Sequence, residues 1–470
     1  MTAIVESERR PGGFAGWIGH IGDVLGAIPG AYRDALRTHP LRTTLLSALV
    51  ILGVFYPLLN RSVLQGFSRN VFPLPIPDDT VVTFMLIFSI MAVGLNIVAG
   101  FAGLLDLGYV AFYAIGAYTA AFLASPHFGV VSIVLLANVP QGFPGIHIPF
   151  WFIVPLAMII AGTFGALLGA PTLRLRGDYL AIVTLGFGEI VPVVFRNLAD
   201  VTIKFNFLFI NFSAEHLNLT GGPLGINPID PPYLPGLGIT FNASAGFAPV
   251  YLAMILLALG VLFARNLERS RIGRAWMAIR EDELAAEMMG VHTVRTKLLA
   301  FALGASFAGI AGSLQASYLG ATTSDFFQFS TSILVLIMVI LGGIGNIWGV
   351  IVGAVALQYV NLTLLPYLGQ QIQSIAPSFP NPAQFNFLFF GLILVVMMRF
   401  RPEGFIPNRQ RAAQLSAHVL AAAAAERGEV VGLDNTGLDI DENIELAPPG
   451  QSEVGEDARA AETSDEARDL

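Results

Sequence analysis

The chain has 470 residues, of which 54% are hydrophobic and only 12% are charged, with a formal net charge of −8. Because charged residues make up about a quarter of an ordinary soluble domain, this composition excludes a soluble globular protein and indicates a chain that crosses a membrane many times. The chain contains no cysteine, which excludes disulfides, thiolate catalysis and metal sites with cysteine ligands.

The first 42 residues are expected to form an amphipathic cytoplasmic segment that lies on the membrane surface. No short apolar core with a small-residue cleavage site follows the charges of this segment, so the sequence indicates no signal peptide. Apolar residues instead recur at helical spacing, at Phe14, Trp17, Ile18, Ile21, Val24, Leu25, Ile28 and Tyr32. The alternative is a helix packed on the protein's own loops.

Ten apolar segments follow, and each is a candidate transmembrane helix. They are Thr43–Leu59, Val81–Ala99, Val110–Ala124, Phe150–Gly169, Tyr179–Phe195, Pro249–Ala264, Leu298–Leu319, Thr331–Gly345, Ile347–Leu362 and Asn386–Phe400. Several are shorter than the roughly 20 residues that a bilayer crossing requires. The sequence therefore predicts an all-α integral membrane protein with about ten transmembrane helices, some short or broken, in a membrane domain of residues 43–404.

The distribution of arginine and lysine predicts the orientation of the chain. If the N-terminus is cytoplasmic, the inner segments up to residue 425 hold 18 basic residues and the outer loops hold four, as the positive-inside rule requires. Both termini are then expected in the cytoplasm. The long outer loops 125–149 and 197–248 are rich in proline and glycine, which suits surfaces that receive something from outside.

A charged stretch at residues 265–297 interrupts the apolar sequence. Each charge at the bilayer centre costs roughly 2.5–3.5 kcal/mol, so this stretch must lie in water. It is expected to form a folded cytoplasmic loop that contacts a soluble partner. The alternative is a solvated loop whose positive charges only fix the topology.

The sequence lacks the motifs of several enzyme classes. Its only lysines, Lys204 and Lys297, do not follow a glycine, so the chain has no phosphate-binding GxxxxGKS or GxxxxGKT loop and is not itself an ATPase. The histidines show no HExxH spacing, and no GxSxG sequence occurs. Transport of a solute is the function class that these absences leave. A channel is disfavoured because the sequence shows no repeated polar residues that could form a ring.

Three polar residues inside apolar segments are candidates for a translocation path: Asn96, Asp106 and Glu189. Closely spaced glycines between residues 94 and 108 weaken the helix around Asn96 and Asp106 and permit an unwound break, as in transporters whose half-helices face a substrate. The alternative is a tight cytoplasmic turn in which Asp106 caps the next helix. Glu189 either lines the path or is a buried, paired structural carboxylate.

Several runs of sequence resemble the LivM-type permease of branched-chain amino acid ABC importers. They are GLNIVAGFAGLLDLGYVAFYAIGAYTAAFL from residue 94, LRLRGDYLAIVTLGFGEIV at residues 173–191, TGGPLGI from residue 220, LGGIGN from residue 341 and RPEG from residue 401. The resemblance implies an ABC-importer permease architecture and import of leucine, isoleucine or valine. The alternatives are a related importer of urea, amides or other amino acids, or an ion-coupled secondary transporter with Asp106 or Glu189 as the coupling carboxylate.

The same resemblance implies the assembly in which the chain works. We expect a second, LivH-type permease, two ABC ATPase subunits, a substrate-binding protein outside the membrane and membrane lipid as partners, with no nucleic acid. The expected location is the bacterial inner membrane. The chain is not expected to be an enzyme or to bind a cofactor, since ATP and Mg²⁺ would be held by the ATPase subunits.

In such importers a cytoplasmic loop carries an EAA-xxx-G motif whose short helix docks on the ATPase. Ala285, Ala286 and Gly290 keep this spacing, whereas Leu284 stands where the glutamate would and Glu283 lies one position earlier. We expect Glu283, Ala285, Ala286 and Gly290 to couple the chain to the ATPase. An apolar helix face would consist of Ala285, Met288 and Met289, with Arg280, Glu281, Asp282 and Glu287 on a polar one, and Gly290 would end the helix.

Three segments lie outside the resemblance. One is the N-terminal segment, and the second is the apolar insertion at residues 197–219. The third is the tail at residues 405–470, expected to be cytoplasmic and largely disordered because it is strongly acidic beyond residue 425. No function is assigned to these three segments.

Overall fold

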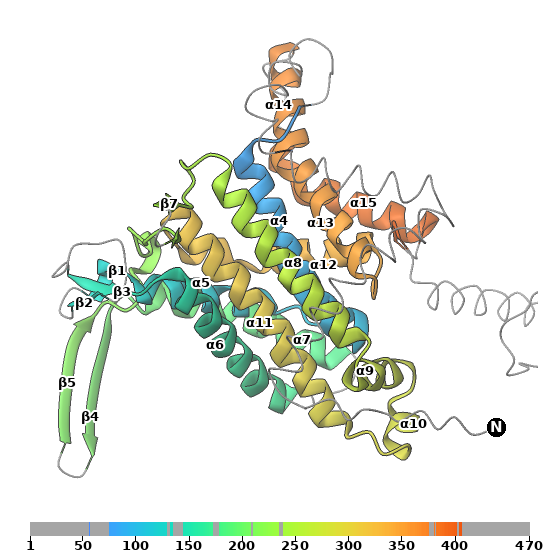
Figure 1. Cartoon of the computed structure of the whole chain (residues 1–470), viewed down its shortest axis with the longest axis horizontal. Helices are drawn as coiled ribbons and strands as arrows, with labels where there is room; N and C mark the ends of the chain where they lie inside the picture. The colour runs from blue at the N-terminus through green and yellow to red at the C-terminus, as the bar shows by residue number, and fades with distance from the viewer. Residues whose placement is uncertain are drawn as a thin grey trace, which may run out of the picture. The chain divides into compact units, whose positions relative to one another are not determined.

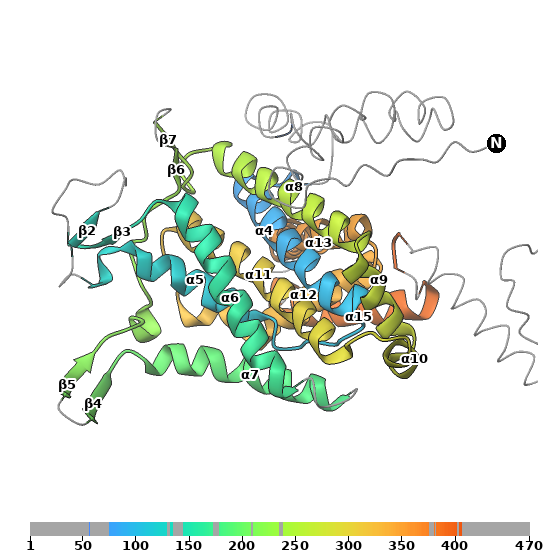
Figure 2. The ribbon, with the colours of Figure 1, turned by 60° about the horizontal axis from the view of Figure 1, so that its bottom comes forward.

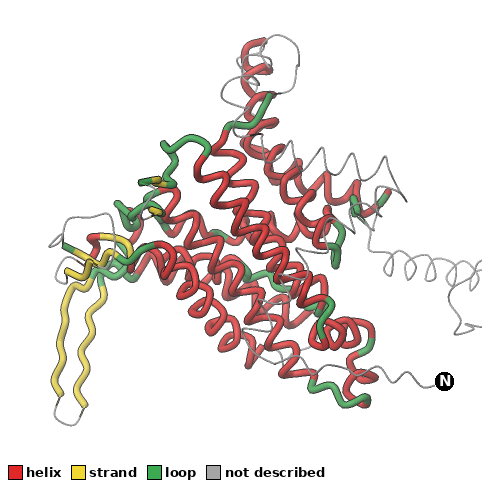
Figure 3. Tube along the Cα trace, viewed as in Figure 1, coloured by secondary structure: helices red, strands yellow, loops and turns green. Residues whose placement is uncertain are grey.

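A computed structural model of the chain describes residues 56, 75–128, 132–134, 144–172, 178–207, 210–234, 238–375, 380, 382–401 and 404–406. The expected amphipathic segment 1–42, nearly all of the expected span 43–59 and the tail beyond residue 406 lie outside these residues. The described part is a bundle of helices joined by loops and a few short strands (Figure 1, Figure 3).

The helices of this bundle, in chain order, are α4 (Asp79–Leu95), α5 (Val110–Leu123), α6 (Phe150–Thr172), α7 (Asp178–Asn197), α8 (Ala248–Glu268), α9 (Arg271–Glu281), α10 (Glu283–Met288), α11 (Thr293–Leu319), α12 (Phe329–Gly342), α13 (Ile347–Tyr359), α14 (Leu365–Ile375) and α15 (Asn386–Phe400). Two π-helical turns interrupt them, η2 (Asn96–Phe101) and η6 (Val360–Leu364). Short 3₁₀ turns include η5 (Ser324–Phe327).

Nine of the ten apolar segments expected to span the membrane fall on helices, and the tenth lies in the part that is not described. Within the described residues, six helical segments of 19 to 28 residues are long and apolar enough to cross a bilayer. The apolar helices α5, α12 and α15 are shorter, with 14, 14 and 15 residues. The expectation of an all-α membrane protein with some short or broken helices is therefore confirmed.

The expected helix break lies between α4 and α5. After η2 the backbone from Ala102 to Tyr109 is not helical, and most of it is buried, although Gly103 and Leu105 are exposed. Leu107 N donates a 3.0 Å hydrogen bond to Thr184 Oγ1 of α7, and Tyr109 Oη donates a 2.9 Å bond to the carbonyl of Gly304 in α11. Irregular backbone of this kind is tolerated in a membrane protein where protein covers it. The alternative of a cytoplasmic turn depends on the position of the membrane and stays a prediction.

Helix α11 packs against α4, α5 and α6, between which it runs in both ribbon views (Figure 1, Figure 2). Glycines allow these helices to approach closely. A Cβ atom added to Gly116 of α5 would lie 2.3 Å from the carbonyl oxygen of Gly309 in α11. A Cβ atom on Gly309 would in turn lie 2.6 Å from the carbonyl oxygen of Ala157 in α6. Such contacts replace the hydrophobic effect, which does not drive helix association inside a bilayer.

The strands belong to the loops at residues 124–147 and 198–247. They are β1 (Ala124–Ser125), β2 (Ser132–Val134), β3 (Gly145–His147), β4 (Val201–Phe207), β5 (Ile210–Leu217), β6 (Tyr233–Leu234) and β7 (Ile239–Thr240). The insertion at residues 197–219 forms an antiparallel β4–β5 hairpin, with Phe205 opposite Phe212. This hairpin is a finding that the apolar composition of the segment did not reveal.

One ion pair ties the two loops together. His147 Nδ1 lies 2.6 Å from Asp230 Oδ2, and the amide of Asp230 donates a 2.7 Å hydrogen bond to the carbonyl of Ala124. Partial burial raises the pKa of Asp230 above its usual range, and the hydrogen bond with His147 opposes this shift.

We expect Gly309→Ala to lower the stability of the protein by about 1–3 kcal/mol, because the new methyl group meets the backbone of α6. The matched control is Gly391→Ala, where nothing lies within 4 Å of the added Cβ atom and the gain in helix propensity of about 1 kcal/mol remains. Thermal unfolding of the detergent-solubilised chain measures both. Equal or higher stability of the Gly309 variant would contradict the packing described here.

Candidate functional site

The charged stretch folds into α9 and α10, and a polar side chain caps each of them. Ser270 Oγ accepts a 3.2 Å hydrogen bond from the amide of Gly273 at the start of α9. Asp282 Oδ1 accepts bonds of 2.9 and 3.0 Å from the amides of Leu284 and Ala285 at the start of α10. These side chains satisfy amides that have no partner within a helix. The stretch is therefore a folded element and not a loose loop.

Gly290 ends α10 as expected. Its φ angle is +87°, a conformation that L-residues with a side chain rarely adopt. The amide of Gly290 donates a 2.9 Å bond to the carbonyl of Glu287, and the amide of Val291 donates a 3.1 Å bond to that of Ala286. This pattern is the Schellman termination of a helix.

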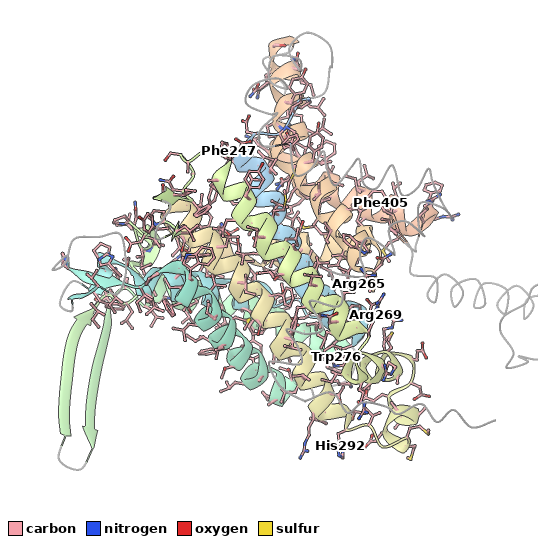
Figure 4. All side chains as sticks on the ribbon, viewed as in Figure 1. Phe247, Arg265, Arg269, Trp276, His292 and Phe405 are labelled. Atoms are coloured by element: carbon pink, nitrogen blue, oxygen red, sulfur yellow. The ribbon has the colours of Figure 1, made fainter. Side chains whose placement is uncertain are left out.

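Two side chains of α9 attach it to the helical bundle, and Figure 4 shows one of them, Trp276, at the end of the bundle that also carries Arg265, Arg269 and His292. Trp276 is fully buried, and its Nε1 donates a 2.7 Å hydrogen bond to the carbonyl of Thr296 in α11.

Arg280 makes the second attachment, to the π-helical turn η2. Its Nη1 donates a 2.6 Å hydrogen bond to the carbonyl of Gly100. The stem of the same side chain lies against Gly103, where an added Cβ atom would be 2.5 Å from Arg280 Cγ. Arg280, expected on a polar face, is partly buried, and its guanidinium satisfies a carbonyl at the helix break.

Glu283, expected to contact the ATPase, is engaged within this chain. Its Oε1 lies 2.6 Å from Nζ of Lys297 in the first turns of α11. The Lys297 side chain is only 8% exposed, whereas that of Glu283 is 36% exposed. Helix α11 begins at Thr293, before the apolar sequence expected from Leu298 onward, so Lys297 lies within its first turns. A buried lysine requires a partner, and Glu283 supplies it.

The exposed apolar side chains of α10 and its C-terminus differ in part from the expected set. Met288 is 84% exposed, Met289 85% and Leu284 58%. Ala285 is exposed as well, while Ala286 is buried. Leu284 thus joins the apolar face expected from Ala285, Met288 and Met289, and Ala286 packs inward. Large apolar side chains this exposed mark a surface that meets another protein or a membrane.

Asn96 lies at the first position of η2 and is fully buried. Its Oδ1 accepts a 2.8 Å hydrogen bond from the amide of Gly345, in the turn between α12 and α13. Gly100 leaves room for this contact, because an added Cβ atom there would lie 2.1 Å from Asn96 Oδ1. In this conformation Asn96 joins the helix break to the turn and faces no described cavity.

Asp106 is buried in the non-helical stretch after η2. Its Oδ1 accepts a 2.9 Å bond from the amide of Gly108, and its Oδ2 has no hydrogen-bond partner among the described residues. The first amide of α5, that of Val110, is instead satisfied by Ser332 Oγ at 2.9 Å. Asp106 therefore does not cap α5, and one buried carboxylate oxygen stays available for a further interaction.

Glu189 is exposed on α7 and lines an open groove of about 690 Å³ between α7, α12 and α15. The groove also includes Pro192, Val193 and Arg196 of α7. Near its end, Arg196 Nη2 lies 2.5 Å from Asp325 Oδ1. Within this chain Glu189 is therefore exposed, and whether it lines a path or is paired depends on what covers the groove, so both alternatives stay predictions.

The three candidate path residues do not form a single site. Asn96 and Asp106 do not line the groove that Glu189 lines, although the two regions adjoin across α7. An added Cβ atom on Gly188, the neighbour of Glu189, would lie 3.3 Å from the Cα atom of Gly108. A movement of the non-helical stretch at Gly108 would therefore displace α7.

The groove lies in an apolar surface of α7 and α15, whose exposed side chains include Ile190, Val193, Val194, Leu388, Leu392, Val395 and Val396. A carboxylate on a surface of this kind costs about 3 kcal/mol when it faces lipid. Water or another protein must therefore face Glu189, while apolar parts of the same surface can contact lipid or protein.

Comparison with known proteins places the chain among permeases. Residues 79–398 match the family described as branched-chain amino acid transport system / permease component. The chain is 37% identical to the high-affinity branched-chain amino acid transport system permease protein LivM of Salmonella typhimurium over 381 residues, which are 77% of this chain and 74% of that protein. Identity to LivM of Escherichia coli is 35% with the same coverage. LivH of Salmonella typhimurium is 24% identical over 327 residues, which are 67% of this chain and 91% of LivH. No solved structure matches the chain.

Sequence reasoning missed Trp276 and Lys297 as residues of the site, and it missed the contact of Arg280. Lys297 carried a signal, since it is one of only two lysines in the chain and directly precedes an apolar helix. The spacing of Ile272, Trp276 and Ile279 also indicates a buried face on α9. No local pattern reveals the contact of Arg280, because Gly100 lies 180 residues away.

We expect Glu283→Gln to weaken the attachment of α10 to α11 by about 2 kcal/mol, because it leaves the buried ammonium of Lys297 without its charged partner. Hydrogen exchange of the amides at residues 283–297 measures this attachment. Glu287→Gln is the matched control on the exposed face of the same helix. Unchanged exchange in the Glu283 variant would show that the ion pair does not hold α10.

Proposed function

Because this chain belongs to the family of permease components of branched-chain amino acid transport systems, we propose that it forms part of the membrane path of an ATP-driven importer of leucine, isoleucine and valine. The chain is a permease component and not itself catalytic. The observation that carries the proposal is the pair of helices α9 and α10. Helix α10 is capped and exposes Leu284 and Met288, while Arg280 of the preceding α9 bonds to the helix break.

The importer that we propose contains this chain, a LivH-type permease, two ABC ATPase subunits and a substrate-binding protein outside the membrane. The similarity to both LivM and LivH supports a pair of related permeases. ATP and Mg²⁺ are held by the ATPase subunits. Residues 43–404 form the permease domain in the bacterial inner membrane, with both termini and residues 265–297 in the cytoplasm.

The ATPase docks on α10 in this proposal. A short amphipathic helix that lays apolar side chains into a groove is a common recognition mode, and Leu284, Met288 and Met289 are exposed for it. Three of the expected coupling residues fix the position and the end of α10. Glu283 holds the helix to Lys297, Ala286 packs inward and Gly290 ends the helix. Ala285 lies on the exposed surface.

A displacement of α10 reaches the membrane interior through α9. Arg280 bonds to Gly100 of η2, whose first residue, Asn96, bonds to Gly345. From η2 the chain continues through Asp106 to Leu107, which bonds to Thr184 of α7. We infer that movement of the ATPases shifts this break and thereby α7, as alternating access requires. Asn96 and Asp106 act at the break in this scheme.

The solute passes along the groove lined by Glu189, between this chain and the second permease. The cost of a carboxylate in contact with lipid supports this placement, as do the apolar surfaces of α7 and α15 on both sides of it. In the groove Glu189 attracts the ammonium group of an amino acid, while the apolar lining contacts its side chain. Arg196 lies at the end of α7, where it can meet the carboxylate.

We expect Met288→Asp to reduce recovery of the ATPase subunits with the purified chain by about tenfold, because a charge replaces a central apolar contact. Ile239→Asp is the matched control, since it puts the same charge at an exposed apolar residue of β7, in the loop that precedes α8. Quantitative mass spectrometry of the complex purified from native membranes measures recovery. Full recovery with the Met288 variant would place the docking surface elsewhere.

A further inference from the structure

A second cavity lies inside this one chain, beside the groove. Its volume is about 300 Å³, and its walls come from α4, η5, α5, α11, α12, α13, η6 and α15. Ser330 and Phe387 line both the cavity and the groove, so these two side chains separate them. A volume of this size is at the lower end of the range for small-molecule sites and suits a small solute.

The cavity lies away from the end of the bundle that carries α9 and α10. It is lined by residues near the start of α4, such as Phe84, and near the end of α11, such as Gln315. The opposite ends of these two helices meet α9, through Gly100 after α4 and Thr296 at the start of α11. With the orientation proposed above, the cavity belongs to the outer half of the membrane domain.

Two polar groups in the wall of the cavity have no partner. The hydroxyl of Tyr113 and the Oε1 atom of Gln315 are buried, and neither makes a hydrogen bond to a described residue. Tyr113 is 1% exposed and Gln315 is 7% exposed. Buried polar groups nearly always have a partner, and a small rotation of either side chain toward the cavity would allow these two groups to bond to a polar occupant.

Three amides form the opposite part of the wall. Asn361 Nδ2 donates to Gln358 Oε1 at 3.3 Å, and Asn386 Nδ2 donates to Asn361 Oδ1 at 3.4 Å. Both distances exceed the usual range of about 2.7–3.2 Å, so these amides are incompletely satisfied. Asn361 lies in the π-helical turn η6, and π-helical turns inside α-helices are frequent at functional sites.

Charge and apolar surface complete the lining. Asp325 lines the cavity, while its partner Arg196 lines the groove, with 2.5 Å between Asp325 Oδ1 and Arg196 Nη2. This pair of opposite charges is complementary to a zwitterion, whose ammonium group can face Asp325 and whose carboxylate can face Arg196. The aromatic rings of Phe84 and Phe88 provide an apolar wall for a side chain.

We propose that this cavity binds a zwitterionic amino acid with an apolar side chain, as a site within one permease subunit beside the path. The choice of solute rests on the proposed function. Asp325 and Arg196 bind the charged groups, Tyr113, Gln315 and Gln358 supply hydrogen bonds, and Phe84 and Phe88 contact the side chain. A solute leaving the groove can enter when Phe387 changes rotamer.

Photo-leucine, a leucine analogue with a diazirine in its side chain, tests the proposal on the full-length chain within its complex in native membranes. Irradiation is expected to label peptides of α4 and α12, at residues near Phe84 and Leu334, and excess L-leucine is expected to suppress the label. Gln315→Leu should reduce labelling of these peptides about tenfold, because a site built to hydrogen-bond a ligand then lacks its partner. Gln371→Leu, at an exposed glutamine of α14, is the matched control and should leave the label unchanged.

The variant is expected to fold, because an apolar residue of similar shape removes the buried Oε1 acceptor that has no partner among the described residues, and its thermal unfolding midpoint checks this. Labelling confined to groove residues such as Val193 and Ile337, or labelling in the cavity that Gln315→Leu leaves intact, would overturn the proposal. ATP-driven leucine uptake by the unmodified membranes is measured in parallel. Uptake without labelling of the cavity rejects this inference alone, whereas absent uptake rejects the proposed function.

Discussion

The hydrogen bond from Arg280 to the carbonyl of Gly100 joins α9 to the place where the helix from α4 is broken. A π-helical turn leaves backbone groups out of the regular ladder, and a charged donor is a strong partner for such a carbonyl. The stem of Arg280 also requires a residue without a side chain at Gly103. Around this contact, buried Trp276 holds α9 to α11, so that α9 and the bundle are packed together.

The break itself connects elements that are distant in sequence. Asn96 holds the turn before α13, and the non-helical stretch beyond η2 contacts α7 at Thr184 and α11 at Gly304. Glycines make these close approaches possible. A side chain at Gly100 would collide with the amide of the Asn96 side chain, and one at Gly108 would collide with the backbone of Thr184. The arrangement thus couples a surface helix to the helix that carries Glu189, through short contacts between rigid elements.

Much of this architecture follows from the sequence, because it depends on local rules. Hydropathy predicts the spans, the glycine spacing predicts the break near Asn96, and Gly290 predicts the end of α10. The partners of charged side chains could not be predicted in this way. Glu283 pairs with Lys297 and Arg280 bonds to Gly100 only after the chain has folded, because pairs of this kind are set by tertiary contacts. The β4–β5 hairpin was missed because an apolar insertion beside a membrane helix has the composition of either a strand or a helix.

The most direct test of the account compares ATP hydrolysis with leucine uptake in proteoliposomes that contain the complete importer, with Arg280→Met in this chain. Methionine keeps an unbranched apolar stem but removes the donor to Gly100. The account predicts ATP hydrolysis close to that of the unmodified importer and leucine uptake about tenfold lower, while Arg274→Met, at an exposed arginine of the same helix, leaves both unchanged. Undiminished uptake by the Arg280 variant would contradict the claim that this contact transmits the motion of the ATPases.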